Sequence, residues 1–174
     1  MNLCDLTLQD FRNYTRQTLE FDPGVNLIVG DNAQGKTNLL EAIVYLGSGK
    51  SFRAQRGAEM VRFGQDLADI SGTVYSQERN QTLRAVIFSG RRSRQLWKNG
   101  VKLKSAEGLS GIMPTVLFCP EDLLVLKAGA SARRRLVTAD FASYGPIMTL
   151  LYPNTTGFWK KKAGFSRTAL KIRR

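Results

Sequence analysis

An eight-residue stretch has the residue types and the spacing that bind a phosphate group. It contains Gly30, Asp31, Asn32, Ala33, Gln34, Gly35, Lys36 and Thr37, and it fits the pattern G-x-x-x-x-G-K-[ST]. In this pattern small residues let successive backbone N–H groups surround phosphate oxygens, the lysine adds a positive charge and the threonine hydroxyl binds Mg²⁺. The sequence therefore predicts a nucleotide-binding loop at residues 30–37.

The segments on either side of this loop must position it. The apolar run Val25–Val29 precedes it and predicts a strand, while residues 38–46 have the apolar spacing of an amphipathic helix that opens at about Gly35. The N-terminus of such a helix directs unpaired N–H groups and a positive dipole end at a bound anion. Gly47 to Gly49 is expected to end the helix. Its apolar face is predicted to contain Leu39, Leu40, Ile43, Val44 and Leu46.

The remaining segments predict mostly β-structure. Residues 2–8 and 17–21 alternate apolar and polar side chains, which indicates a β-hairpin. Three further strands are expected at 68–75, 81–88 and 94–98, and Asn99-Gly100 is a strong hairpin signal, so an antiparallel meander should occupy about 67–104. A buried strand is predicted at 114–118. Together these elements place the chain in the α/β class.

The charge of the chain points to a polyanionic partner. The formal net charge is +12 with a pI near 10.2, and half of this charge lies in residues 136–174. A basic loop runs from Lys50 to Arg56, and it is either a phosphate contact or a solvated surface. The same two interpretations apply to the basic residues of the meander: Arg84, Arg91, Arg92, Arg94, Lys98, Lys102 and Lys104.

Several classes of protein are disfavoured. No apolar run approaches the length of a membrane span, and Asp5 and Asp10 lie where a secretory signal needs an apolar centre, so a cytoplasmic location is expected. The 174 residues include no His, which removes the commonest general base. Phosphoryl transfer remains compatible, because it depends on positioning and on charge stabilisation.

Five sequence blocks in this order resemble the RecF family of bacterial DNA replication and repair proteins. The resemblance extends from Leu6 to about Arg135. The phosphate-loop motif alone names no family, but the five blocks together are specific. They are residues 8–14, 30–43, 49–53, 117–123 and 131–135.

The resemblance implies a P-loop NTPase fold: an ABC/SMC-type head lobe with a mixed sheet and an antiparallel meander. It implies ATP and Mg²⁺ as cofactors, with Thr37 holding the metal and with Arg12 and Asn13 near the triphosphate. Glu121 and Asp122 would lie in the segment that links ATP to the second lobe. In such heads ATP lies between two protomers, so a nucleotide-dependent homodimer is expected.

The implied function is that of an ATP-dependent DNA-binding protein. It would act in DNA replication, recombinational repair and the SOS response, and would bind single-stranded DNA and gapped or junction DNA. It would also aid recombinase loading together with recombination mediator proteins. No membrane association is implied.

The resemblance stops after Arg135, where the family continues with a helical arm, a signature motif and a Walker B strand with paired acids. Without these motifs the head is expected to be incomplete and enzymatic turnover stays open, and the strand at 25–29 is expected to have an open edge. The overlapping reading frame of residues 140–166 permits a helix-forming sequence. We therefore expect a head at 1–135 and a poorly ordered, basic frameshift product at 136–174, with the shift near Leu136.

Two other functions remain open. A small P-loop kinase or GTPase would need a second acidic Mg²⁺ site after a buried strand, and none is visible in the sequence. A basic fragment that binds nucleic acid non-specifically, with an inert phosphate loop, would show steep salt dependence without nucleotide dependence.

Overall fold

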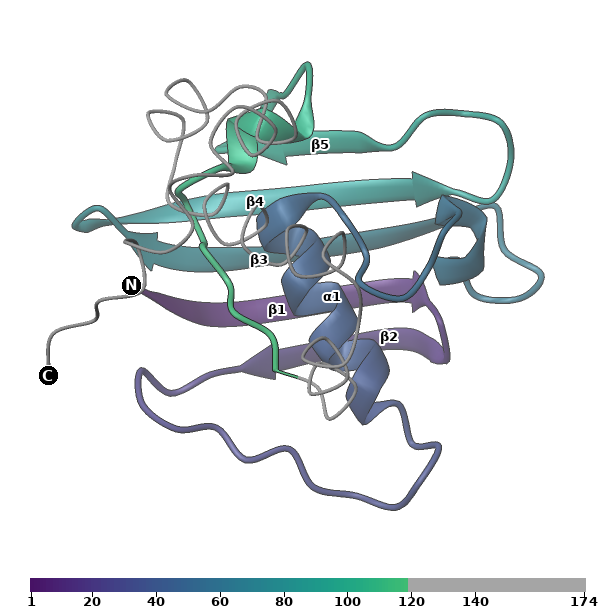
Figure 1. Cartoon of the computed structure of the whole chain (residues 1–174), viewed down its shortest axis with the longest axis horizontal. Coiled ribbons are helices and arrows are strands. Elements are labelled where there is room, and N and C mark those ends of the chain that lie inside the picture. Colours follow the sequence, from purple (N-terminus) through teal and green to yellow (C-terminus); the bar gives the residue numbers. More distant parts are fainter. Residues whose placement is uncertain (119–174) are drawn as a thin grey trace, which may run out of the picture. The chain divides into compact units, whose positions relative to one another are not determined.

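A six-stranded sheet with one α-helix across a face forms the architecture of the computed structural model, which describes residues 1–118 (Figure 1). The order of the strands in the sheet is β2-β1-β3-β4-β5-β6, and every pairing is antiparallel. The strands are β1 (Asn2–Phe11), β2 (Tyr14–Glu20), β3 (Leu67–Ser76), β4 (Arg79–Phe88), β5 (Gln95–Lys98) and β6 (Val101–Lys102). The helices are α1 (Lys36–Ser48) and the 3-10 turns η1 (Gly57–Met60) and η2 (Ala106–Leu109).

The N-terminal hairpin is confirmed, with longer strands than predicted. Its last pair joins Phe11 to Tyr14, which leaves Arg12 and Asn13 as a two-residue turn. Arg12 has a φ of 53°, in the left-handed region that tight hairpin turns require. The turn therefore presents two polar side chains at one end of the sheet.

The meander is also confirmed. β3 and β4 pair over their full length, from Leu67 opposite Phe88 to Ser76 opposite Arg79. Between β5 and β6, Asn99 and Gly100 have φ values of 48° and 77°, the positive pair that the Asn-Gly signal predicts. These local patterns account for the order of the last four strands, β3-β4-β5-β6.

Helix α1 begins and ends at the glycines that the sequence indicates. Gly35 precedes it with a φ of 104°, and Gly49 follows it with a φ of 67° and donates its N–H to the carbonyl of Tyr45 at 2.7 Å. Between them the helix lies across the sheet (Figure 1). The core below it contains alternate residues of the strands, among them Leu6, Leu8, Ile70, Val74, Leu83 and Ile87.

The buried face of α1 differs from the predicted one. Leu39 and Leu46 are buried as expected, but Leu40 is 40% exposed and Ile43 and Val44 are only half-buried. The sheet contacts a face that is rotated toward Ala42 and Tyr45, and that face also includes the carboxylate of Glu41. The apolar spacing of this helix supports two faces, and only one of them meets the sheet within residues 1–118.

Two predicted strands do not form. The segments 25–29 and 114–118 have no strand assignment, and most of their apolar side chains are exposed, whereas Ile28 and Leu117 are half-buried. A strand is stable only where neighbouring strands pair with its N–H and C=O groups, and no described strand pairs with either segment. The exposed residues are Val25 at 95%, Leu27 at 83%, Val29 at 75%, Val116 at 92% and Phe118 at 73%.

The predictions for Glu121, Asp122 and the tail at 136–174 lie outside the described residues. Along the described part of the chain, no helix is both long and apolar enough to cross a membrane.

Candidate functional site

The loop between residue 30 and α1 depends on backbone conformations that favour glycine. Gly30, Ala33 and Gly35 all have positive φ values, 151°, 66° and 104°. A Cβ atom at Gly35 would lie only 2.7 Å from the side-chain amide of Asn13. The second glycine of the motif is therefore required both by its φ and by the close approach of the hairpin turn.

The loop has the donors that a phosphate needs. Lys36 folds back over it, and its Nζ donates to the carbonyl oxygens of Gly30 and Asp31, each at 2.7 Å. The first N–H groups of α1, from Lys36 to Asn38, have no backbone acceptor within residues 1–118, as is usual for a helix N-terminus. The side chain of Thr37 is exposed in the first turn. This donor set fits a polyphosphate.

The hairpin turn holds the loop from the other side. Asn13 donates its Nδ2 to the carbonyl of Gln34 at 3.1 Å, and the hydroxyl of Tyr14 donates to the carbonyl of Gly35 at 3.2 Å. Asn38 in turn donates to Oδ1 of Asn13 at 2.7 Å. Burial raises the pKa of Tyr14, so its hydroxyl keeps the proton that it donates. The structure thus places Asn13 against the loop, while its expected position near a triphosphate stays a prediction.

Arg12 instead reaches α1, where it binds a fully buried carboxylate. Glu41 is 0% exposed and accepts two hydrogen bonds from Arg12, at 2.9 and 2.8 Å. It also accepts from Arg53 at 2.9 Å and from the hydroxyl of Ser51 at 2.6 Å. Arg53 bonds Asn38 as well. Glu41 therefore joins the hairpin turn, α1 and the loop at residues 50–56.

The pKa of Glu41 is lowered by these partners. Burial alone would raise the pKa, but the hydrogen bonds from Arg12 and Ser51 and the charges of Arg12 and Arg53 outweigh it. The carboxylate consequently stays ionised at neutral pH and holds both guanidinium groups in place.

Glu41, Tyr14 and Asn38 were not predicted as site residues from the sequence. One signal was present for Glu41: it lies four residues before the buried Tyr45 and directly beside Ala42, so it belongs to the face that meets the sheet. A charged residue on a buried helix face requires partners. The arginines that supply them come from segments far away in the sequence.

A metal site made of protein ligands alone is not present in this part of the chain. Within residues 1–118, no three His, Cys, Asp or Glu side chains lie close enough together to hold an ion. The only predicted ligand in these residues is the Thr37 hydroxyl, which would act together with phosphate oxygens.

Comparison with known proteins identifies the family. Residues 5–135 match the profile of the AAA_23 family, described as an AAA domain. The chain belongs to this AAA domain family. The match covers the loop at 30–37, α1 and the sheet except the first three residues of β1, and its end coincides with the point at which the resemblance in the sequence stops.

Curated relatives are DNA replication and repair proteins named RecF. The protein of Lactobacillus delbrueckii subsp. bulgaricus is 40% identical over 146 residues, which is 84% of this chain and 38% of the relative. The protein of Acidothermus cellulolyticus is 46% identical over 134 residues, which is 77% of this chain and 36% of the relative. The resemblance to RecF is confirmed, and the chain spans about two fifths of the length of these relatives.

Solved structures confirm the fold class. The recombination mediator protein RecF-ATP of the RecFOR pathway has a TM-score of 0.78 and 34% identity, and the match covers 98% of this chain and 46% of that one. RecF-ATPrS of the same pathway has a TM-score of 0.74 and 39% identity, covering 79% and 37%. An SMC ATPase that undergoes ATP-driven dimerization matches with a TM-score of 0.65, covering 79% and 98%, and its 20% identity supports the fold alone. The AAA domain therefore has the ABC/SMC-type head fold.

Proposed function

We propose that this AAA domain binds ATP and Mg²⁺ at residues 30–37 and serves as the nucleotide-dependent DNA-binding head of a protein of DNA replication and recombinational repair. The observation that carries the proposal is the loop itself. Its positive φ values, its folded-back lysine and the unpaired N–H groups of α1 make a donor set that fits a polyphosphate.

Each residue of the loop has a role in the proposed site. Backbone N–H groups from Asp31 to Gly35 would surround the phosphates, and Lys36 would exchange its two loop carbonyls for phosphate oxygens. Thr37 would hold Mg²⁺ through its hydroxyl. ATP would supply the triphosphate charge that this site neutralises. Asn13 would hold the loop from the hairpin turn through its bond to the carbonyl of Gln34.

Arg12 and Arg53 share the one carboxylate of Glu41, so this cluster would keep a net positive charge near the same site. The guanidinium of Arg12 is fixed by Glu41 and by the carbonyl of Glu59, so its position does not depend on a bound ligand. A preorganised cation of this kind avoids the entropic cost of ordering a long side chain on binding.

The proposal also includes the type of DNA that is bound, the partner proteins and the formation of a dimer. The DNA would be single-stranded, gapped or junction DNA, and the protein would aid recombinase loading in the SOS response together with recombination mediator proteins. Binding of ATP would promote a homodimer. A role on chromosomal DNA would place the protein in the cytoplasm. Support comes from the RecF relatives, from the ATP-driven dimerization described for the SMC neighbour and from the formal net charge of +6 in residues 1–135.

The nucleotide dependence of DNA binding tests this proposal. Fluorescence anisotropy with a labelled gapped duplex should show tighter binding when ATP and Mg²⁺ are added to the wild-type chain. Lys36→Ala should abolish this increase and leave the nucleotide-free affinity unchanged. Salt-sensitive binding that ignores ATP would contradict the proposal, and would instead fit a basic fragment that binds nucleic acid non-specifically.

A further inference from the structure

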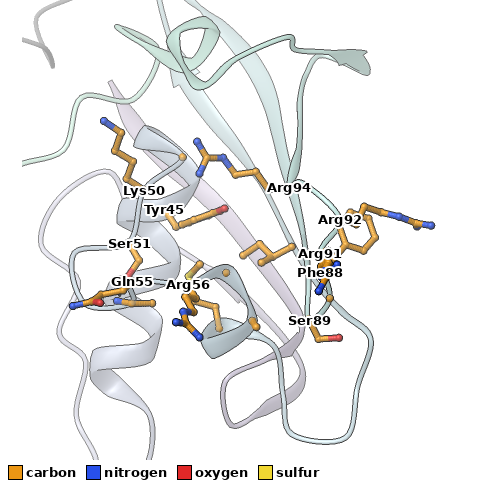
Figure 2. A pocket seen from close by; sticks show the side chains of 17 residues that line it. Tyr45, Lys50, Ser51, Gln55, Arg56, Phe88, Ser89, Arg91, Arg92 and Arg94 are labelled. Carbon is orange, nitrogen blue, oxygen red and sulfur yellow. Dashed lines mark hydrogen bonds between the residues drawn. The ribbon is translucent and has the colours of Figure 1, made fainter.

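A basic cavity lies at the end of α1 that is remote from the phosphate loop (Figure 2). Its volume is about 690 Å³, and it is bounded by residues 49–60 on one side and by the β4–β5 connection on the other. Because α1 has 13 residues, the two ends of the helix lie about 20 Å apart. The cavity is therefore separate from the proposed nucleotide site.

Five cations line this cavity, and no acidic side chain does so among the residues described. They come from two loops that are well separated in the sequence, one after α1 and one between β4 and β5. In Figure 2, Arg94 points toward Tyr45, while Lys50 and Arg92 extend outward on opposite sides. The lining cations are Lys50, Arg56, Arg91, Arg92 and Arg94.

These cations are not neutralised by partners within residues 1–118. The ion pairs found there involve Arg12, Arg53, Arg62 and Arg84, none of which lines the cavity. The contrast with Arg84 is informative, because Arg84 is paired with Asp69 and stacks on Trp97. In the sequence, Arg84 belongs to the same basic stretch as Arg91, Arg92 and Arg94. In the structure Arg84 is ion-paired, whereas the other three line the cavity without an acidic partner among the residues described.

An aromatic ring supports one of the cavity arginines. The Arg92 guanidinium lies 4.9 Å from the centre of the Phe88 ring. Such a contact holds a guanidinium in place without neutralising its charge. Near Arg94, burial raises the pKa of Tyr45, and the positive charge of Arg94 opposes that rise.

We propose that this cavity binds phosphodiester groups of a DNA backbone. The inference rests on the proposed DNA-binding function and assigns it a surface. Guanidinium groups match phosphate geometry with paired N–H donors, and unpaired cations spread over an open cavity suit a repeating anion better than a single small one. The contacts are to the backbone, so they carry no sequence preference.

The test compares two double variants with equal loss of charge. Arg91→Gln with Arg92→Gln alters the cavity, and Arg16→Gln with Arg79→Gln removes two exposed cations outside it. Affinity for a labelled duplex with a single-stranded extension is measured by anisotropy at salt concentrations from about 50 to 200 mM. The cavity variant should bind about tenfold more weakly, with a salt slope less steep by about 2. The control should stay within about twofold of wild type, since it leaves the backbone contacts in place.

The possible outcomes separate this inference from the proposed function. If the wild type binds no DNA, both fail. If the wild type binds DNA and the two double variants lose the same affinity, the cavity assignment is overturned while the proposed function stands. Loss of inorganic phosphate binding with DNA affinity retained would also overturn it, in favour of a small-anion site. ATP affinity should be unchanged in both variants, and a Lys50→Gln variant repeats the test if the double variant fails to fold.

Discussion

The sheet and the segments at 25–29 and 114–118 contain similar apolar residues. Those of the sheet are largely buried, whereas most of those in the two segments are exposed to solvent. Leu6 in β1 is completely buried, whereas Leu27 before the phosphate loop is 83% exposed. Both belong to runs that the sequence predicts as strands. β1 pairs on both sides, with β2 and β3, while the segment at 25–29 pairs with no described strand. Burial here follows from hydrogen-bonded neighbours and not from hydrophobicity alone.

The phosphate loop keeps its conformation although the segment before it, residues 25–29, pairs with no described strand. The residues before the loop contribute no strand pairing and only one core contact, that of Ile28, so the position of the loop depends largely on Asn13, Tyr14 and α1. Glu41 anchors the same hairpin turn through Arg12. The site is therefore supported from its hairpin and helix side.

Truncating one leucine in each region tests whether burial depends on strand pairing. Leu6→Ala should lower the free energy of unfolding by about 2–5 kcal/mol, because it leaves a cavity in a fully packed core. Leu27→Ala should change it by less than about 0.5 kcal/mol, because the side chain is already in water. Urea denaturation of both variants provides the measurement. Equal losses would show that the 25–29 segment is packed in solution.

Removal of the buried carboxylate tests the support of the loop. Glu41→Ala should cost about 2–3 kcal/mol, at the lower end for a broken buried ion pair because Arg12 and Arg53 are partly exposed. Glu41→Gln should cost less, since it keeps part of the hydrogen bonding. A neutral effect of the alanine variant in urea denaturation would mean that the two arginines are held by other contacts.

The pH dependence of stability gives a second measure of Glu41. Its folded pKa is lowered from 4.5, so its contribution is full above about pH 4.5 and is lost as the pH falls through the folded value. The wild type should therefore lose stability in acid more steeply than Glu41→Ala. Parallel acid unfolding curves would contradict the lowered pKa.

A smaller loss of stability than at Leu6 or Glu41 is expected at the loop glycine. Gly35→Ala should cost about 1–2 kcal/mol, because its φ is 104° and a Cβ atom would press against Asn13. Gly24→Ala is the matched control, since a Cβ atom there meets nothing within 4 Å. Thermal unfolding of the two variants measures the difference. A harmless Gly35→Ala change would mean that the loop can move away from the hairpin turn.

Local patterns were sufficient to predict much of the fold. The Asn99-Gly100 turn, the hairpin at the N-terminus and the glycines at both ends of α1 depend on a few adjacent residues, and all of them were predicted. The failed strands at 25–29 and 114–118 depend on partner strands, which no local pattern supplies. The face of α1 that meets the sheet was ambiguous for a similar reason, because leucines and isoleucine occupy both sides of the helix.

In the candidate site, too, features that depend on adjacent residues were predicted, and features that depend on distant partners were not. The phosphate loop was evident from its spacing, and Asn13 was expected near it from the resemblance. Glu41 was not predicted as a site residue, because its partners Arg12 and Arg53 lie 29 and 12 residues away in the sequence. The basic cavity was missed as a unit, since its arginines and Lys50 come from separate loops.

Calorimetric titration with ATP and Mg²⁺ tests whether residues 30–37 form the nucleotide site. The wild-type chain should bind the nucleotide, Lys36→Ala should show no measurable binding, and Lys104→Ala should match the wild type because that lysine is exposed and lies outside the loop. Circular dichroism should show all three chains equally folded. Undiminished ATP affinity in the Lys36→Ala variant would contradict the assignment of residues 30–37 as the nucleotide site.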